Sequence, residues 1–200
     1  MLCAARHAKE ATVIISGEFV PGIGGGICQV SSTLYNAALL AGMEIIERSN
    51  HGRAVGYLPP GHDATIAFNY KDLKFKNNLS HHILIAAETV GNRLIIRVFG
   101  HNKTWEKIDI KTTDLEKIEP EIQIITKEDL PEGERKLIQA GSPGYRVTVL
   151  RIFYDGDEEI KREKLSSDFY KPTPTIYHAG KEEEKEDITV LDQVKEDDSL

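Results

Sequence analysis

The sequence has few cysteines and no long apolar run. Cys3 and Cys28 are the only cysteines among 200 residues, and no Cys or His spacing typical of a zinc finger occurs. No stretch approaches the roughly 18 apolar residues that a membrane-spanning helix needs. The opening MLCAARHAKE has no apolar core typical of a secretion signal. We therefore expect no disulfide framework, no transmembrane segment and no visible signal peptide.

A basic surface is also missing. The formal net charge is −7, and residues 181–200 carry nine acidic and three basic residues, so six of the net negative charges lie there. The rest of the chain is nearly neutral, which argues against a nucleic-acid partner. Residues 181–200 have too few large apolar side chains to form a core, and we predict a disordered acidic tail.

The first half predicts one helix followed by strands. The stretch 11–19 favours a strand, and the proline and glycines of 21–26 indicate a turn. Apolar residues recur at helical spacing over 29–41, and Gly42 follows as a stop. Beyond the helix, segments rich in β-branched residues predict strands at 43–48, 64–70, 81–90 and 93–100, the last two joined as a hairpin by Gly91-Asn92.

The second half predicts only strands. Residues 103–111 are charged and poorly periodic, typical of a linker, while the segments EIQIITKEDL, YRVTVLRIFYDG and TPTIYHAG favour strands. The predicted fold class is α+β. A mixed domain (1–102) with one main helix and antiparallel strands precedes the linker (103–111), a small all-β module (112–180) and the tail (181–200).

The glycine-rich segment PGIGGGICQ, directly before the helix, has several interpretations. Strand, glycine turn and helix, with Glu47 about twenty residues later, are typical of dinucleotide-binding units. However, Ile27 stands where the third glycine is needed, and no lysine follows to make a phosphate-binding loop. A nucleotide cofactor is therefore disfavoured, and we expect no cofactor.

Cys28 is the candidate nucleophile. It lies in the first helical turn, where unpaired N–H groups and the helix dipole favour a thiolate. His51 is the candidate base and Asp63 the candidate orienting group. This order resembles that of transglutaminase-like and papain-like folds, which act on amide bonds. The residues expected to contact substrate are Gly25, Gly26, Gln29 and Tyr57.

Other interpretations of the same residues remain open. Cys28 is equally a small apolar side chain at a helix start, with the glycines serving only the turn. His62 is an alternative to His51, and a metal site built from Cys28, His51 and His62 lacks compact ligand spacing. The helical hydroxyls are expected to bond the backbone; they belong to Ser31, Ser32 and Thr33.

Several motifs of the first half follow one another within residues 11–100: GGGICQVSSTLYNAALLAGMEIIER, then His51, then VGYLPPGHDATI and DLKFKNN. Taken together, they resemble the VanW family, named after vancomycin-resistance gene clusters. The family's domain extends further toward the N-terminus, so we expect this copy to be N-terminally incomplete. A signal peptide or membrane anchor would belong to the preceding part.

The second half is similar to a G5 domain, a β-rich module of bacterial surface proteins. The glycines that carry this resemblance are Gly133, Gly141, Gly144, Gly156 and Gly180. Such modules are thought to bind polymers that contain N-acetylglucosamine, which would suit exposed aromatic residues. The candidates on these strands are Tyr145, Phe153 and Tyr154.

The two resemblances imply a protein of the bacterial cell envelope, associated with peptidoglycan or glycopeptide resistance. If Cys28, His51 and Asp63 converge, we expect a cysteine-dependent amidase or transpeptidase-like acyl transfer on peptidoglycan peptides. The alternative is a non-catalytic protein that binds peptidoglycan or serves adhesion. The expected partners are the peptide or N-acetylglucosamine components of peptidoglycan.

Overall fold

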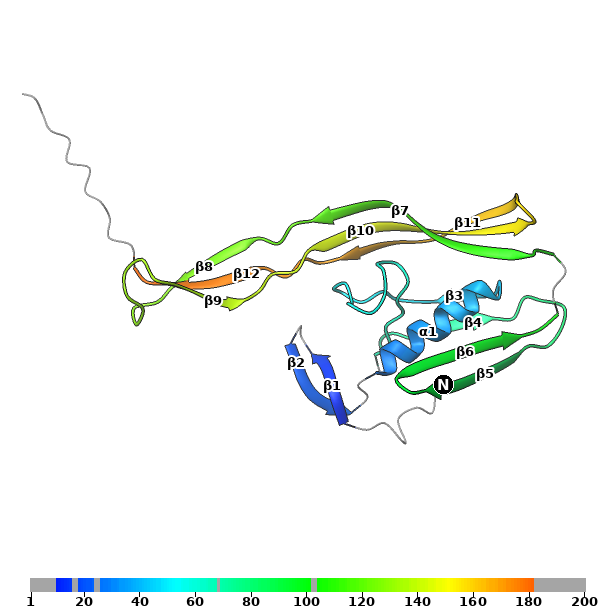
Figure 1. The fold of residues 1–200 in the computed structure, drawn as a ribbon, viewed down its shortest axis with the longest axis horizontal. Helices are drawn as coiled ribbons and strands as arrows, with labels where there is room; N and C mark the ends of the chain where they lie inside the picture. Colours follow the sequence, from blue (N-terminus) through cyan, green and yellow to red (C-terminus); the bar gives the residue numbers. More distant parts are fainter. Residues whose placement is uncertain (1–9, 16–17, 24–25, 68, 102–103, 182–200) are drawn as a thin grey trace, which may run out of the picture.

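The computed structural model describes residues 10–15, 18–23, 26–67, 69–101 and 104–181. The chain is elongated, with a wide part built around one helix and a thin sheet that extends away from it (Figure 1). The predicted disordered tail lies outside the described residues, apart from Lys181.

The N-terminal half contains the predicted helix and hairpin. Its elements are β1 (Glu10–Ile15), β2 (Glu18–Ile23), α1 (Ile27–Leu40), β3 (Glu44–Glu47), β4 (Lys74–Lys76), β5 (Leu84–Val90) and β6 (Arg93–Phe99). Three antiparallel pairs form, β1 with β2, β3 with β4 and β5 with β6. Among the described residues α1 is the only helix, which confirms the predicted α+β class.

Three sequence predictions in this half are wrong. Residues 11–15 and 18–19 belong to two paired strands instead of one strand, and β2 includes Pro21 and Gly22, which were predicted to lie in a turn. A two-stranded ladder has open edges, where a proline without an N–H is tolerated. Residues 64–70 form no strand and contain only an isolated bridge between Ala67 and Lys71. Their backbone is instead bonded by side chains of α1, as described below.

The C-terminal half is all β in its described residues, as predicted. Its strands are β7 (Lys107–Ile118), β8 (Ile122–Thr126), β9 (Arg135–Gln139), β10 (Gly144–Asp155), β11 (Glu158–Tyr170) and β12 (Thr175–Ala179). Residues 107–111, predicted to belong to a linker, are the start of β7 and pair with β10.

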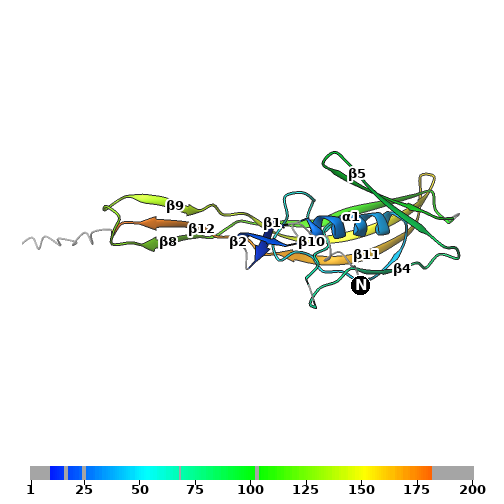
Figure 2. The same cartoon turned by 90° about the horizontal axis from the view of Figure 1, so that it is seen from below.

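These strands form two separate three-stranded sheets. The inner sheet has the order β11-β10-β7 and is antiparallel. The outer sheet has the order β8-β12-β9, with β12 parallel to β8 and antiparallel to β9. Figure 2 shows the outer sheet projecting beyond the inner sheet, away from α1.

The inner sheet and the helix share one core. Tyr35 and Leu39 of α1 pack with Ile110 of β7 and Leu165 of β11. Ile110 and Leu165 also contact the second core cluster, which includes Val147 and Val149 of β10 and Tyr170 of β11. The two halves of the sequence are therefore joined by a continuous apolar contact instead of a flexible connection.

A buried arginine strengthens this contact. The Arg151 guanidinium on β10 donates to the carbonyl oxygens of Met43, at 2.7 Å, and Leu39, at 3.4 Å, where α1 ends. A cation at this place is favoured by the negative end of the helix dipole. Glu163 of β11 pairs with the same guanidinium.

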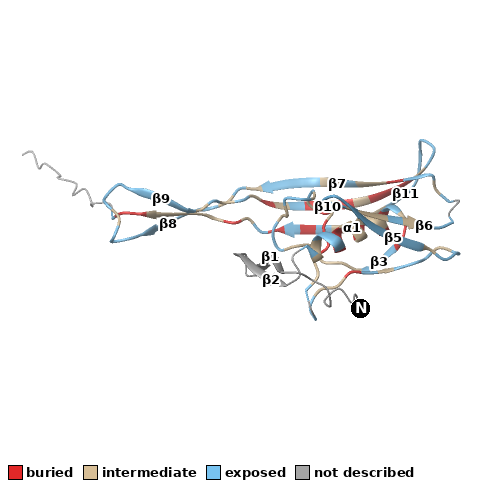
Figure 3. Ribbon diagram, turned by 60° about the horizontal axis from the view of Figure 1, so that its bottom comes forward, coloured by how far each residue is buried: buried red, intermediate tan, exposed pale blue. Residues whose placement is uncertain are grey.

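Burial differs sharply between the two sheets (Figure 3). The inner sheet carries buried residues along β10, including Phe153, which stacks edge-on against Trp105. Phe153 is therefore a core residue and not an exposed aromatic group for sugar. The outer sheet exposes Ile122, Ile124 and Leu137. No described helix has the length and apolarity to cross a bilayer.

Candidate functional site

Cys28 lies in the first turn of α1 and is partly buried. Its Sγ atom is 3.6 Å from the Thr65 hydroxyl and 3.8 Å from the carbonyl oxygen of Ile66. The thiol is therefore surrounded by polar groups on the 64–66 side, which differs from the purely apolar packing expected of a structural cysteine.

The 64–66 segment is fixed beside the helix by serine hydroxyls. Ser32 accepts the Ala64 N–H at 2.9 Å and donates to the Cys28 carbonyl oxygen at 2.7 Å. Ser31 donates to the carbonyl oxygens of Ala64 and Cys28. Thr33 donates to the Gln29 carbonyl oxygen, so the prediction that these hydroxyls bond the backbone is confirmed. These bonds set the position of Asp63, the residue that precedes Ala64.

His51 and Asp63 form the closest polar pair of the site. The His51 Nδ1 atom is 2.5 Å from Asp63 Oδ2, and the backbone N–H of His51 donates to the same oxygen at 2.7 Å. His51 also lies close enough to Cys28 for each side chain to shift the pKa of the other. Because Nδ1 faces Asp63, Nε2 is the ring nitrogen left for the sulfur. The structure thus brings Cys28, His51 and Asp63 together.

The charge distribution favours a thiolate beside a protonated imidazole. The hydrogen bond with His51 lowers the pKa of Cys28 from 9.0 to about 7, against the opposing effect of burial. Burial opposes protonation of His51, but hydrogen bonds with Asp63 and Cys28 outweigh it and raise its pKa from 6.5 to about 9. Between these two values the ion pair is the favoured form.

Asp63 remains ionised although its side chain is 1% exposed. Burial alone would raise its pKa, but hydrogen bonds from His51 and Tyr170 lower the pKa below its ordinary 3.8. The Tyr170 hydroxyl donates to Oδ1 at 2.5 Å, and Arg48 Nη2 lies 3.1 Å from the same oxygen. One carboxylate oxygen therefore faces His51, and the other is held by Tyr170 and Arg48.

The four predicted substrate contacts lie in different places. The Tyr57 ring stands edge-on to the His51 ring, 6.5 Å between centroids. Gly26 is the N-cap of α1, and Gln29 is exposed on the first turn. Gly25 lies outside the described residues. Tyr57 thus lies beside His51, Gly26 and Gln29 lie at the same end of α1 as Cys28, and their contact with substrate stays a prediction.

His62 is engaged elsewhere. Its Nδ1 lies 3.2 Å from Asn36 Oδ1 and its Nε2 lies 3.4 Å from the Thr112 hydroxyl. Burial and the charge of Arg48 lower its pKa, so the ring is neutral at pH 7. These contacts leave His51 as the partner of Cys28. Within the described part of the chain, no group of three metal-ligating side chains is arranged to hold an ion.

Sequence reasoning missed Arg48 and Tyr170. Arg48 directly follows β3, a short strand that has charged residues at both ends. Nothing in that pattern indicated that the Arg48 side chain is only 6% exposed. Tyr170 lies 107 residues after Asp63, in the other half of the chain. No local pattern connects the two, because their contact depends on how the inner sheet packs against α1.

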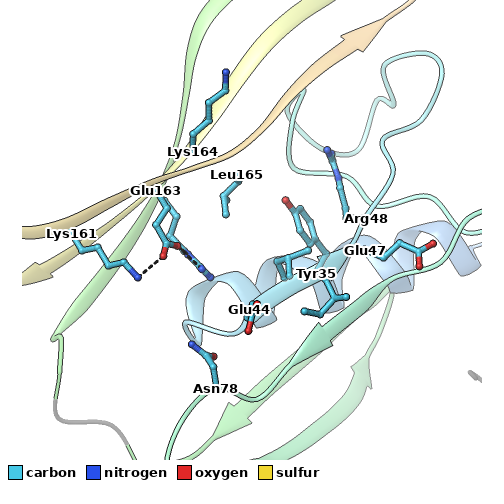
Figure 4. A pocket seen from close by; sticks show the side chains of 12 residues that line it. Tyr35, Glu44, Glu47, Arg48, Asn78, Lys161, Glu163, Lys164 and Leu165 are labelled. Carbon is cyan, nitrogen blue, oxygen red and sulfur yellow. Dashed lines mark hydrogen bonds and ion pairs between the residues drawn. The ribbon is translucent and has the colours of Figure 1, made fainter.

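A separate groove of about 670 Å³ lies between α1, β3 and β11, and Tyr35 and Arg48 line one end (Figure 4). Two of its basic side chains are paired, because Glu163 bonds both Arg151 and Lys161. The residues that line the groove do not include Cys28.

Comparison with known proteins assigns the two halves to different families. Residues 4–99 match the family model described as VanW like protein, and residues 109–182 match the model described as G5 domain. Over 92 residues the chain is 47% identical to the protein YoaR of Bacillus subtilis strain 168. These residues are 46% of this chain and 30% of that protein.

Two further matches were found. An immunoglobulin A1 protease of Streptococcus sanguinis is 40% identical over 58 residues, which are 29% of this chain and 3% of the protease. A solved G5 domain of an immunoglobulin A1 protease is 30% identical and covers 38% of this chain and 95% of that chain, with a TM-score of 0.28. The chain thus spans less than a third of either curated relative. It consists of a VanW-like region followed by a G5 domain, a combination that indicates a cell-wall-associated protein of the envelope or exterior.

Proposed function

We propose that this chain is a cysteine-dependent amidase or acyl transferase that acts on the peptide part of peptidoglycan. The observation that carries the proposal is His51, whose Nδ1 bonds the buried Asp63 carboxylate and whose imidazole lowers the pKa of Cys28, the direction that nucleophilic catalysis needs. A cysteine that only packs against its neighbours would not need a buried carboxylate–imidazole pair beside it.

The reaction follows from the order of contacts. The Cys28 thiolate attacks the carbonyl carbon of a substrate amide, and a C–S bond forms as the carbonyl oxygen takes the negative charge. His51 Nε2 gives its proton to the amide nitrogen, the C–N bond breaks and an amine leaves. His51 then takes a proton from water or from an acceptor amine, which attacks the thioester and releases the thiolate.

The beginning of α1 is suited to hold the developing oxyanion. The helix has no side-chain cap among the described residues, and the N–H groups of Gln29 and Val30 both donate to the Gly26 carbonyl oxygen, so the N–H groups of Ile27 and Cys28 are the candidates for holding the oxyanion. They lie next to Cys28 and favour negative charge through the helix dipole. Burial raises the pKa of Tyr57, so its hydroxyl stays protonated beside the same site.

The substrate class rests on the two family matches. A G5 domain is a module that binds carbohydrate or cell wall, so it would hold the chain on the glycan while the thiol reaches stem peptides or cross-links. Action on stem peptides would also fit the connection with glycopeptide resistance that the name VanW carries.

The proposal is tested by turnover of peptidoglycan fragments. The full chain is incubated with cross-linked muropeptides, and mass spectrometry follows both the products and the mass of Cys28-containing peptides. We expect amide cleavage or transfer and a transient acyl adduct on Cys28, both abolished in Cys28→Ala and strongly reduced in His51→Asn. His62→Asn is the matched control and should retain turnover, since His62 contacts Asn36 and Thr112 instead.

An absence of both turnover and adduct, with a folded protein that still sediments with peptidoglycan, would favour the non-catalytic alternative. In that case the same polar cluster would recognise a peptide or fix the loops around α1.

A further inference from the structure

The G5 domain contributes a side chain directly to the candidate site. Tyr170, at the end of β11, is fully buried, and burial raises the pKa of its phenol, so the hydroxyl remains a donor. It donates to Asp63 Oδ1 at 2.5 Å and accepts the backbone N–H of Gly61 at 2.7 Å. One hydroxyl thus joins the Asp63 carboxylate to the backbone of its own loop.

A second contact reaches the same carboxylate through Arg48. Asp168 of β11 accepts two hydrogen bonds from Arg48 Nη1, at 2.6 and 2.7 Å. The rest of the guanidinium faces Asp63, with Nε donating to its carbonyl oxygen at 2.6 Å and Nη2 to its carboxylate at 3.1 Å. Asp168 therefore fixes the direction in which Arg48 presents its donors.

The same strand end also holds the loop that carries His51. The Asn50 side chain donates to the Phe169 carbonyl oxygen at 2.9 Å, and the Lys171 N–H donates to the Gly52 carbonyl oxygen at 2.9 Å. These bonds lie on both sides of His51 along the chain. Residues 168–171 of the G5 domain thus bind the loops of both His51 and Asp63.

We propose that Tyr170, together with Asp168 acting through Arg48, positions the Asp63–His51 pair, so that the G5 domain is a structural part of the Cys28 site. The inference rests on the proposed function, because positioning matters only where Cys28 is activated. Without the Tyr170 hydroxyl, Gly61 loses a buried acceptor and Asp63 Oδ1 keeps Arg48 alone, so the 61–63 loop moves and His51 loses its alignment with the sulfur.

The test is the pH profile of Cys28 alkylation by iodoacetamide in the full chain, with Cys3→Ser as the parent. Tyr170→Phe removes only the hydroxyl. Tyr145→Phe is the matched control, since Tyr145 is the register partner of Tyr170, packs against the same cluster and makes no hydrogen bond with Asp63 in the described part of the chain. We expect Tyr170→Phe to move the midpoint from near 7 toward 8.5 or above, and to slow labelling at neutral pH roughly tenfold.

The possible outcomes separate this inference from the proposed function. A parent midpoint near 8.5 would overturn the proposed function, whereas a low parent midpoint that Tyr170→Phe leaves unchanged would overturn only the positioning role. Tyr145→Phe should retain the parent profile, and an equal shift in both variants would also overturn the role. If thermal unfolding shows that Tyr170→Phe does not fold, Asp168→Asn is measured instead, with the same expected shift and the same contradicting result.

Discussion

The inner and outer sheets of the G5 domain each contain three strands, but they differ in how many of their side chains are buried. The inner sheet packs against α1 and buries Val149, Ile152 and Tyr170, while the outer sheet exposes Ile122 and Leu137. The outer sheet has no second layer in the described residues, so its backbone ladders and turns hold it together (Figures 2 and 3). One half of the domain therefore shares the core around α1, whereas the other half buries few of its described side chains.

The largest effect is expected where the inner sheet meets the candidate site. Asp63→Ala removes a buried carboxylate that pairs with Arg48, His51 and Tyr170, and leaves His51 without its carboxylate and the buried Tyr170 hydroxyl without its acceptor. Losing one partner of such a buried network costs about 3–5 kcal/mol of unfolding free energy. Urea denaturation at neutral pH measures this cost.

Asp109→Ala is the matched control for Asp63, since Asp109 lies on β7 and pairs with an exposed lysine. Its loss should cost no more than about 1 kcal/mol. Because the folded-state pKa of Asp63 lies below its ordinary 3.8, its contribution is present above that pH and is lost as the pH falls further. Equal costs for the two variants would show that the Asp63 network does not hold the sheet to the helix.

The next prediction compares the loss of stability when an isoleucine is truncated in each of the two sheets. Ile152 of β10 is 1% exposed and Ile122 of β8 is 69% exposed. Ile152→Ala should lower the unfolding free energy by about 2–5 kcal/mol, because it leaves a cavity in the shared core. Ile122→Ala should change it by no more than about 0.5 kcal/mol. Denaturation midpoints of the two variants in parallel check this, and similar losses would mean that the outer sheet has a core of its own.

The smallest expected difference in stability between two paired variants concerns the close approach of the 59–63 loop to β10. A Cβ on Gly61 would lie 2.3 Å from Val149 Cγ2, and the residue has a φ of 93°. Gly91, at the β5–β6 turn, has a φ of 62° but nothing within 4 Å of its Cβ position. Alanine at either position costs about 1 kcal/mol for the left-handed backbone, and Gly61→Ala adds about 1–3 kcal/mol of overpacking. Thermal unfolding of both variants should show this difference, and equal Tm losses would argue against the close contact.

Local sequence patterns were sufficient to predict the helix and the β5–β6 hairpin. The periodicity of α1 and the Gly91-Asn92 turn predicted a helix and a hairpin that the structure contains. The strand prediction for 64–70 was wrong because its β-branched residues do not pair with another strand. Instead, the backbone of Ala64 is hydrogen-bonded by the side chains of Ser31 and Ser32 on the helix. A side chain that replaces a sheet partner leaves no periodic signal.

The candidate site was only partly visible in the sequence for a similar reason. Cys28, His51 and Asp63 were selected because their residue types and order suit nucleophilic chemistry, whatever the fold. Tyr170 and Asp168 have no such chemistry of their own, and they reach the site only because β11 lies against α1. Long-range packing of this kind depends on the summed burial of many residues, which no short motif contains.

The measurement that tests the central claim most directly is the labelling pKa of Cys28 in the otherwise unchanged chain, with Cys3→Ser to remove the second thiol. Iodoacetamide labelling across pH should give a midpoint of about 7, and His51→Asn should raise it above 8.5, because burial then acts on the thiol without the imidazole. A midpoint near 8.5 in the parent, unchanged by His51→Asn, would contradict an activated Cys28.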